Sequence, residues 1–270
     1  MGMLDGKVVV VSGGTQGLGE ATVRAVVREG ASGVVIVGRD AAKGEQLATE
    51  LTSSSARAVY VAADMADVDT PGRIVEVVGR EFGVAHGLVN VAASTFRDNV
   101  WTAEPDGWDT MMAVNVRAPF FLLQGLAELM RGAGVRGSAV NIGSVSGHGG
   151  QPFILSYCVS KGALATMTKN VSYSLMRHGI RVNQVNPGWM DTAAEDAVQR
   201  RFHGATDGWL DAAEAGQPTG RLIKPPEVAE LIVFLLSDRS GMMTGNIIDY
   251  DQSVQGAGDA PKPSVQETPQ

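Results

Sequence analysis

The segment VVVVSGGTQGLG, residues 8–19, joins a run of valines to a glycine-rich turn. Consecutive β-branched residues favour a strand that is buried on both faces, like the central strands of a parallel sheet. The glycines allow a tight turn in which the backbone can approach a phosphate group, and a helix that begins after them would offer free N–H groups to that phosphate. The segment therefore predicts a strand–turn–helix unit at the start of an α/β domain.

The same alternation continues along the chain, where short apolar runs are separated by longer segments of helical period, as in βαβ units. Further strands are expected at residues 34–37, 58–61, 87–91, 138–142, 181–185 and 246–250. Helices are expected at residues 18–29, 41–52, 71–82, 106–131, 156–178 and 226–236. We predict an α/β fold with a single doubly wound, Rossmann-type parallel sheet of about seven strands and helices on both faces.

The stretch from residue 189 to residue 225 interrupts this alternation with small and charged residues, and only weak helical patterns occur at 193–202 and 205–213. Long irregular insertions in compact domains usually serve a function. We therefore expect residues 189–216 to form a substrate lid, inserted into one dinucleotide-binding and catalytic domain over residues 1–255. Residues 256–270 are polar, contain prolines and lack periodicity, which predicts a C-terminal tail.

The composition is typical of a globular protein, with 44% hydrophobic and 19% charged residues. A net charge of −7 provides no basic surface for nucleic acid, so no nucleic-acid partner is expected. The sequence shows neither an export signal nor an apolar run long enough to span a bilayer, which favours a cytoplasmic protein without a membrane partner. One cysteine and four scattered histidines give no metal-site spacing, so no metal is expected.

A tyrosine and a lysine lie four positions apart, at Tyr157 and Lys161, in the helix expected over residues 156–178. Positions i and i+4 share one face of a helix, so both side chains can enter the same cleft. A nearby cation favours the phenolate and lowers the pKa of a tyrosine from its usual value of about 10. Ser144 follows the fifth expected strand, at the sheet edge where ligands bind, and its hydroxyl can donate to a substrate carbonyl oxygen.

These motifs, in this order, resemble the short-chain dehydrogenase/reductase family over about residues 6–253. The glycine turn resembles the family's T-G-x-x-x-G-x-G loop, with Ser12 at the position of the threonine. Asn90-Val91-Ala92-Ala93 resembles the N-N-A-G motif after the fourth strand, although two of its four positions differ. The segment from Asn186 to Thr192 resembles the one that holds the nicotinamide carboxamide.

The resemblance implies a catalytic tetrad of Asn115, Ser144, Tyr157 and Lys161. In that arrangement Tyr157 exchanges a proton with the substrate oxygen, Lys161 lowers its pKa and holds the ribose hydroxyls, and Ser144 orients the oxygen. Asn115 helps to hold a water molecule next to the lysine. The implied cofactor-binding residues are Ser12, Gly13, Thr15, Gln16, Gly17, Leu18, Gly19, Arg39, Asp64, Met65, Asn90, Ala92, Tyr157, Lys161, Pro187, Gly188, Met190 and Thr192.

The end of the second expected strand, Gly38-Arg39-Asp40, bears on the choice of cofactor. In such folds an acidic residue at the strand tip binds the ribose hydroxyls of NAD, whereas a basic residue accommodates the 2′-phosphate of NADP. Gly38 leaves the acidic position empty and Arg39 follows it directly. The resemblance therefore implies a preference for NADP(H), with NAD(H) as the alternative if Arg39 only stacks on adenine or caps the sheet.

The implied function is hydride transfer between NADP(H) and a carbonyl or secondary alcohol of a small organic substrate. Two other functions stay open on the same fold: a catalytically silent dinucleotide sensor or scaffold, and an isomerase or lyase that recycles its cofactor. The resemblance also implies self-association as a homotetramer, with a dimer as the alternative.

The expected substrate pocket is apolar with a few hydroxyl groups, which suits a ring ketone, a sugar or polyol, or an acyl ketone. His148, four residues after Ser144, is expected to line this pocket rather than act as a second acid or base, and Cys158 is expected to be a buried small hydrophobic residue. The expected pocket residues are Ser94, Phe96, Ser146, Phe153, Trp189 and Phe202.

Overall fold

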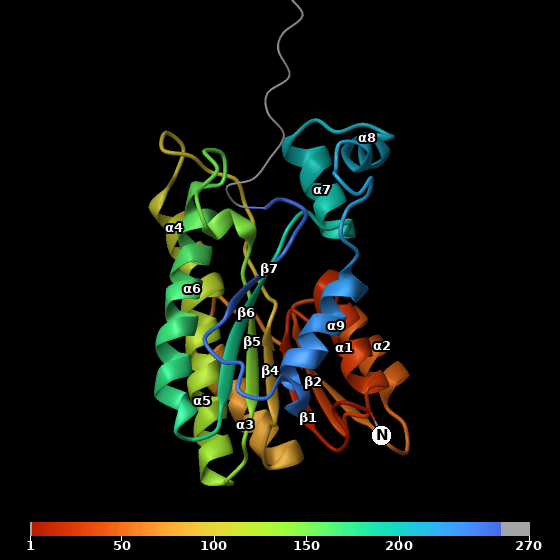
Figure 1. Cartoon of the computed structure of the whole chain (residues 1–270), viewed down its shortest axis with the longest axis vertical. Coiled ribbons are helices and arrows are strands. Elements are labelled where there is room, and N and C mark those ends of the chain that lie inside the picture. The colour runs from red at the N-terminus through yellow and green to blue at the C-terminus, as the bar shows by residue number, and fades with distance from the viewer. Residues whose placement is uncertain (1, 255–270) are drawn as a thin grey trace, which may run out of the picture.

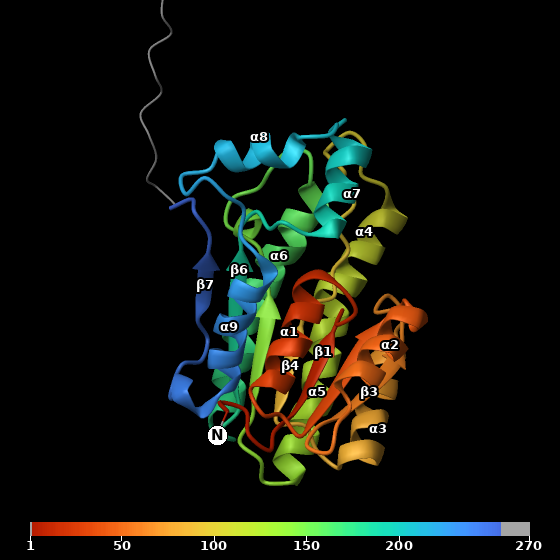
Figure 2. The same cartoon turned by 90° about the vertical axis from the view of Figure 1, so that its right-hand side faces the viewer.

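Seven parallel strands form one sheet in the order β3-β2-β1-β4-β5-β6-β7 in the computed structural model, which describes residues 2–254 (Figures 1 and 2). This confirms the predicted doubly wound α/β fold. The strands are β1 (Val8–Ser12), β2 (Gly33–Gly38), β3 (Arg57–Ala62), β4 (Gly87–Asn90), β5 (Ser138–Ile142), β6 (Arg181–Pro187) and β7 (Ile247–Tyr250).

The connecting helices lie on both faces of the sheet. They are α1 (Gly17–Arg28), α2 (Ala41–Leu51), α3 (Thr70–Phe82), α4 (Pro105–Met112), α5 (Ala118–Gly132), α6 (Leu155–Met176), α7 (Ala193–Phe202), α8 (Trp209–Ala215) and α9 (Pro225–Leu236). Short 3₁₀ turns occur at Val145–Gly147 and Asp238–Ser240. Helices α1, α2 and α9 build one core against the sheet, and α3, α5 and α6 build the other.

Strand β1 pairs with β2 on one side and with β4 on the other, so the chain changes direction across the sheet at this point. The connections on the two sides run over opposite faces, which leaves a crevice at the carboxyl ends of β1 and β4. All five residues of β1 are buried, as its run of valines predicts. The crevice is therefore bordered by strands whose residues are all buried.

The single helix predicted over residues 106–131 is divided in the structure. A π-helical turn, Ala113–Arg117, lies between α4 and α5. Pro119, in the first turn of α5, has no N–H with which to bond the carbonyl of Asn115, so a regular α-helical pattern cannot continue through this point. The irregular turn contains Asn115, one of the predicted site residues.

The predicted lid crosses the carboxyl edge of the sheet with α7 and α8, at the top of both views (Figures 1 and 2). Its second helix begins at Trp209 and not at residue 205, because Gly204 and Gly208 adopt φ values of 65° and 84° in the left-handed region. The expected tail, 256–270, lies outside the described residues. No helix within residues 2–254 is both long and apolar enough to cross a membrane.

Candidate active site

A cleft of about 1070 Å³ opens at the carboxyl edge of the sheet, below the lid. Loops that follow the first six strands contribute to its walls. Most predicted site residues line it: Gly13, Thr15, Gln16, Gly17, Leu18, Arg39, Asp64, Met65, Ala92, Ser144, Tyr157, Lys161, Pro187, Gly188, Met190 and Thr192. The other four, Ser12, Gly19, Asn90 and Asn115, are buried behind this lining.

The glycine turn has the shape that a phosphate group requires. Gly13 and Gly17 have φ values of 70° and 53°, and a Cβ atom on Gly13 would lie 2.7 Å from the backbone nitrogen of Ala92. A Cβ atom on Gly19 would lie 1.9 Å from the Gly13 carbonyl oxygen, so α1 packs tightly against the turn. The first N–H groups of α1 donate no hydrogen bond to the side chain of the N-cap residue, Gln16. They are therefore available to an anion.

The tip of β2 explains why no acidic side chain occupies the usual NAD-selective position. A Cβ atom on Gly38 would lie 2.6 Å from Cγ2 of Thr15, so a longer side chain there would clash with the phosphate turn. Asp40 bonds the backbone of Lys43 and begins α2. Arg39 is exposed and lines the cleft. Asp64 also lines this end, with one carboxylate oxygen bonded to the Ala66 N–H at 2.9 Å.

The opposite end of the cleft is built from the turn after β6. Gly188 packs on Asp251, since a Cβ atom on it would lie 1.7 Å from Oδ1 of that residue. Thr192 begins α7 by accepting a hydrogen bond from the Glu195 N–H, and its methyl group faces Gly17 across the cleft. The phosphate turn and the lid therefore meet at Thr192.

Tyr157, Lys161 and Ser144 are brought together from α6 and the carboxyl end of β5. The Ser144 hydroxyl lies near the Tyr157 phenol and acts to lower its pKa, and the Lys161 ammonium lies 5.5 Å from the centre of the tyrosine ring. Lys161 is buried, with 3% of its surface exposed, and donates to the Ile142 carbonyl at 2.7 Å. The helical spacing thus places phenol and ammonium on one wall of the cleft.

Burial opposes the charged form of both groups. It raises the pKa of Tyr157 to about 12, although the Ser144 hydroxyl and the Arg97 charge act in the opposite direction. Burial also lowers the pKa of Lys161 to about 8. At neutral pH the phenol is therefore protonated and the lysine is mostly charged. Lys161 was expected to lower the pKa of Tyr157. In the protein without bound ligands, burial is the largest influence on this pKa, and it acts in the opposite direction.

Asn115 lies behind the cleft and not on its surface. Its side-chain oxygen accepts from the Ser94 N–H at 2.7 Å, while its nitrogen donates to the Ser94 carbonyl at 3.0 Å and to Ser160 Oγ at 2.9 Å. Ser160 neighbours Lys161 on α6. The side chain thus joins the π-helical turn, the loop after β4 and α6.

A chain of buried amides runs beneath Ser144. Gln184 donates to Asn186 Oδ1 at 2.7 Å, and Asn186 donates to Asp249 Oδ1 at 2.9 Å on the edge strand β7. His148 lies 2.6 Å from the same carboxylate oxygen. A Cβ atom on Gly143 would lie 2.0 Å from Asn186 Oδ1, so the glycine before Ser144 lets this chain pass. His148 belongs to this chain and is not among the residues that line the cleft.

Two aromatic residues expected in the substrate pocket lie elsewhere. Phe96 packs against Gly107 of α4, where a Cβ atom would lie 3.1 Å from its ring, and Phe202 carries the Arg201 guanidinium over its own ring at 4.9 Å. The pocket is also more polar than expected. Side chains of the lid and of the loops after β4 and β5 add Arg97, Gln151, Glu195, Gln199, His203 and Gln217.

Asp98 is a further residue that sequence patterns did not reveal. It has only 5% of its surface exposed, and its carboxylate accepts from the Ser156 N–H at 3.0 Å and from the Ser156 hydroxyl. Its own carbonyl accepts from the Leu155 N–H at 3.2 Å. Asp98 therefore fixes the first turn of α6, immediately before Tyr157. Its separation of 58 residues from Ser156 leaves no local signal.

With this geometry established, comparison with known proteins decides the family. Residues 13–254 match a family model described as enoyl-(acyl carrier protein) reductase, which belongs to the short-chain dehydrogenases/reductases. The chain is a short-chain dehydrogenase/reductase. This enzyme therefore transfers hydride between a nicotinamide cofactor, NAD(P), and alcohol or ketone groups.

Similar enzymes cover almost the whole chain. A 2-(S)-hydroxypropyl-CoM dehydrogenase of Xanthobacter autotrophicus is 33% identical over 254 residues, which are 92% of this chain and 96% of that enzyme. An NADP-dependent (R)-specific alcohol dehydrogenase of Lentilactobacillus kefiri is 31% identical over 90% of this chain and 94% of its own. The crystal structure of L-sorbose reductase from Gluconobacter frateurii with NADPH and L-sorbose has a TM-score of 0.87 and 28% identity, and the match covers 95% of this chain and 100% of that one.

The residues of the cleft fit the dinucleotide that the family uses. The uncapped start of α1 and the close approach of Gly13 to Ala92 suit a pyrophosphate. Arg39 and Asp64 suit the adenosine end, and the turn around Gly188 suits the nicotinamide end. Within residues 2–254 no group of three or more His, Cys, Asp or Glu side chains is arranged to hold a metal ion.

Proposed function

We propose that the enzyme transfers hydride between NADP(H) and a carbonyl or secondary alcohol of a small organic substrate, with Tyr157 as proton donor and acceptor. The observation that carries this is that Ser144, Tyr157 and a buried Lys161 line the same cleft, with the Lys161 ammonium 5.5 Å from the centre of the Tyr157 ring. The nicotinamide, when bound, supplies or accepts the hydride. The protein's own residues govern the proton.

In the direction of reduction, Ser144 donates a hydrogen bond to the substrate carbonyl oxygen and holds it near the phenol. Tyr157 is protonated at neutral pH and gives its proton to that oxygen as negative charge develops. Lys161, charged at pH 7, stabilises the phenolate that remains. In the direction of oxidation the same groups take the proton back, and Asn115 keeps α6 and the loop after β4 in register.

Replacing Tyr157 with phenylalanine tests this assignment. The ring remains but the transferable proton is lost, so turnover of the best ketone in a carbonyl screen should fall by about two or more orders of magnitude. The affinity for NADPH, measured by fluorescence titration, should stay within about twofold. Cys158→Ser, at the next position but outside the proposed chemistry, serves as the control. A phenylalanine variant with near wild-type turnover would refute the role of Tyr157.

The same screen tests the reaction itself. Each NADPH consumed should yield one molecule of alcohol. Turnover of a substrate without net NADPH consumption would instead identify an isomerase or lyase, and binding of NADPH without any turnover would identify a silent sensor.

We further infer a preference for NADP(H), supported by exposed Arg39 at the tip of β2 and by Thr15, which excludes a side chain at Gly38. A charge-assisted contact with a 2′-phosphate contributes about 1.5 to 3 kcal/mol. Arg39→Gln should therefore weaken NADPH binding about tenfold or more and leave NADH binding nearly unchanged, while Arg39→Lys should retain much of the preference. Equal binding of both reduced cofactors by the wild type would contradict this inference.

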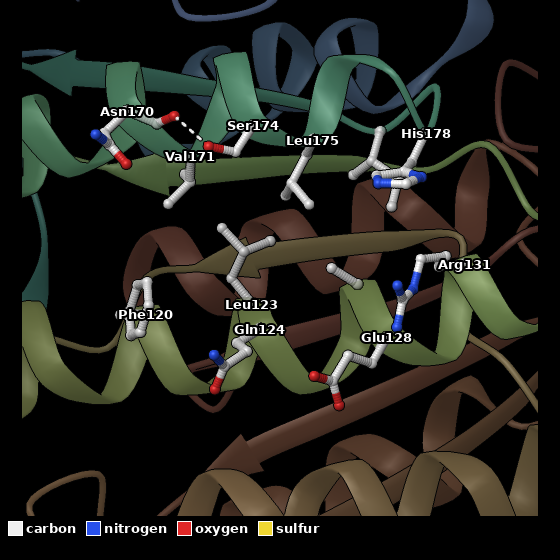
Figure 3. A pocket seen from close by; sticks show the side chains of 12 residues that line it. Phe120, Leu123, Gln124, Glu128, Arg131, Asn170, Val171, Ser174, Leu175 and His178 are labelled. Carbon is white, nitrogen blue, oxygen red and sulfur yellow. Dashed lines mark hydrogen bonds between the residues drawn. The ribbon is translucent and has the colours of Figure 1, made fainter.

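We also infer that the enzyme self-associates, as a tetramer or a dimer, through α5 and α6. A hollow of about 400 Å³ lies between these helices, with Phe120 and Leu123 on one side and Val171 and Leu175 on the other (Figure 3). Large apolar side chains are exposed on the same two helices, with Phe121 47% and Tyr173 74% exposed. A second copy that covers this surface would remove it from water.

A further inference from the structure

Arg97 is a cation of the cleft without an acidic partner. Its Nη1 donates to the Thr95 carbonyl at 3.1 Å, and its Nε is buried with no hydrogen-bond partner among residues 2–254. No carboxylate in that part of the chain lies within salt-bridge distance of it. Buried charges and donors are normally satisfied, so this guanidinium is suited to an anionic ligand.

The backbone holds Arg97 beside the reacting tyrosine. The next residue, Asp98, is anchored to the first turn of α6 through Leu155 and Ser156, and Tyr157 follows directly. Arg97 and Tyr157 both line the cleft. The charge of Arg97 acts on the phenol and opposes the rise in the pKa of Tyr157, as expected for a cation that faces it. The position of the guanidinium is therefore built into the site.

The surroundings leave this charge uncompensated. Thr95, whose carbonyl accepts from Arg97, is neutral, and so are Gln151 and Phe153, which the loop after β5 adds to the lining. Glu195, the one acid that lid residues 189–216 add to the lining, already accepts from Trp189 Nε1 and Gln199 Nε2, both at 2.8 Å. Arg39 and the glycine turn belong to the loops after β2 and β1, so they, and not Arg97, are placed for the cofactor phosphates.

We propose that Arg97 binds an anionic oxyacid group of the substrate, a carboxylate or a sulfonate, and so directs the neighbouring carbonyl toward Ser144 and Tyr157. The preferred substrates are then keto acids and hydroxy acids rather than neutral ketones. A guanidinium forms charge-assisted and often bidentate hydrogen bonds with such groups, which fixes the orientation of the substrate as well as adding affinity. The proposal rests on the function proposed above and names its substrate class.

A matched pair of ketones tests the proposal. The probes are 4-oxocyclohexanecarboxylate and its methyl ester, each reduced with saturating NADPH by the wild type, Arg97→Gln and Arg97→Lys. We expect the wild type to prefer the acid in kcat/KM by about tenfold or more. Arg97→Gln should lose this preference chiefly through a higher KM for the acid, with the ester changed by less than about twofold, and Arg97→Lys should recover part of it.

A binding measurement separates this proposal from the proposed reaction. The acid is titrated calorimetrically into the complex of the enzyme with NADP+. It should bind to the wild type, and Arg97→Gln should weaken this binding about tenfold or more. Titration of 4-oxocyclohexanesulfonate in place of the acid shows which oxyacid group is preferred. Binding without turnover would keep the substrate class and reject the reaction. The role of Arg97 would be overturned if the wild type reduced acid and ester with equal kcat/KM. It would also be overturned if Arg97→Gln lowered kcat/KM equally for both ketones, or if it raised the KM for NADPH.

Discussion

Single residues at the site are held in states that cost the free protein energy. Lys161 is a cation in a buried position whose one hydrogen-bond acceptor is the Ile142 carbonyl. A pKa lowered from 10.5 to about 8 corresponds to about 3 kcal/mol against the charged form. In the mechanism proposed above, this loss of stability accompanies the catalytic role of Lys161, a trade-off common at active sites.

We predict that Lys161→Met stabilises the free enzyme while it abolishes turnover. Methionine removes the desolvation cost of about 3 kcal/mol but leaves the Ile142 carbonyl without its donor, a loss of about 1 kcal/mol. The free energy of unfolding at pH 7 should therefore rise by about 1 to 2 kcal/mol. Lys169→Met, at an exposed position of the same helix, should change it by less than about 0.5 kcal/mol.

The pH dependence of this gain has a definite sign. Between the folded pKa of about 8 and the unfolded value of 10.5, the unfolded chain binds more protons at Lys161, so the wild type gains stability as the pH rises. The advantage of Lys161→Met over the wild type should shrink from pH 7 to pH 10 in urea denaturation. A constant difference over this range would show that the ammonium is not desolvated as described.

Residues were predictable where they belong to a local pattern and unpredictable where they do not. The helix period predicted that Tyr157 and Lys161 share a face and the strand end placed Ser144 at the ligand edge, while their assignment as catalytic residues came from the family resemblance. Asp98 acts on Ser156, and Arg97 acts in a cleft that forms only on folding. No periodicity marks either of them, so the acidic cap and the cation of the pocket had to be found in the structure.

At the scale of elements, α6 depends on a residue from another part of the chain. Its N-cap residue, Ile154, has no side chain that could accept from the first turn, and Asp98 does this from the loop after β4. A carboxylate near a helix N-terminus also interacts favourably with the helix dipole. The start of the catalytic helix is therefore coupled to the loop that carries Arg97.

We predict that Asp98→Ala lowers both stability and turnover. It leaves the Ser156 N–H and hydroxyl without an acceptor, which should cost about 1 to 3 kcal/mol of unfolding free energy, and it loosens the turn that positions Tyr157. Asp98→Asn keeps an acceptor oxygen and should lose less in both respects. Thermal denaturation and kcat would be measured together. An alanine variant with wild-type melting temperature and kcat would show that α6 begins correctly without this cap.

The π-helical turn is the element that periodicity could not show. The apolar spacing over residues 106–131 fits one long helix, and Pro119 alone marks the irregularity. A proline is tolerated in the first turn of a helix, so its position predicts a helix start there as readily as a break. The bonds of Asn115 to Ser94 and Ser160, which hold this turn against α6, join segments 21 and 45 residues away.

At the scale of the whole molecule, the apolar alternation was enough to predict one parallel sheet and the edge at which ligands bind. Each strand of the centre is buried on both faces and each crossover carries a helix, which the sequence shows directly. The height of the lid above the cleft and the polar character of its inner side were not predictable. They depend on glycine conformations at 204 and 208 and on how α7 meets Thr192.

We predict that the double variant Phe121→Glu/Tyr173→Glu forms smaller assemblies than the wild type, because charged side chains would have to be buried between copies. Both positions are exposed, so the fold of each copy should be unaffected. Light scattering after size-exclusion chromatography gives the molar mass. Val68→Glu serves as the control, because Val68 precedes α3 in the sequence and is 64% exposed. An unchanged molar mass in the double variant would place the contact elsewhere.

The segment from Trp189 to Ile223, which contains the lid, is closed by hydrogen bonds between its two ends. The Ile223 N–H donates to the Trp189 carbonyl at 3.0 Å, and the Asp191 N–H donates to the Ile223 carbonyl at 2.9 Å. The chain between them therefore leaves β6 and reaches α9 through one closed point, and extra length there carries only a small entropic cost. Evolution or an engineer can exchange the part of this segment that follows Thr192 as a cassette, changing which molecules are admitted while the turn at Thr192 and the cleft below it are kept.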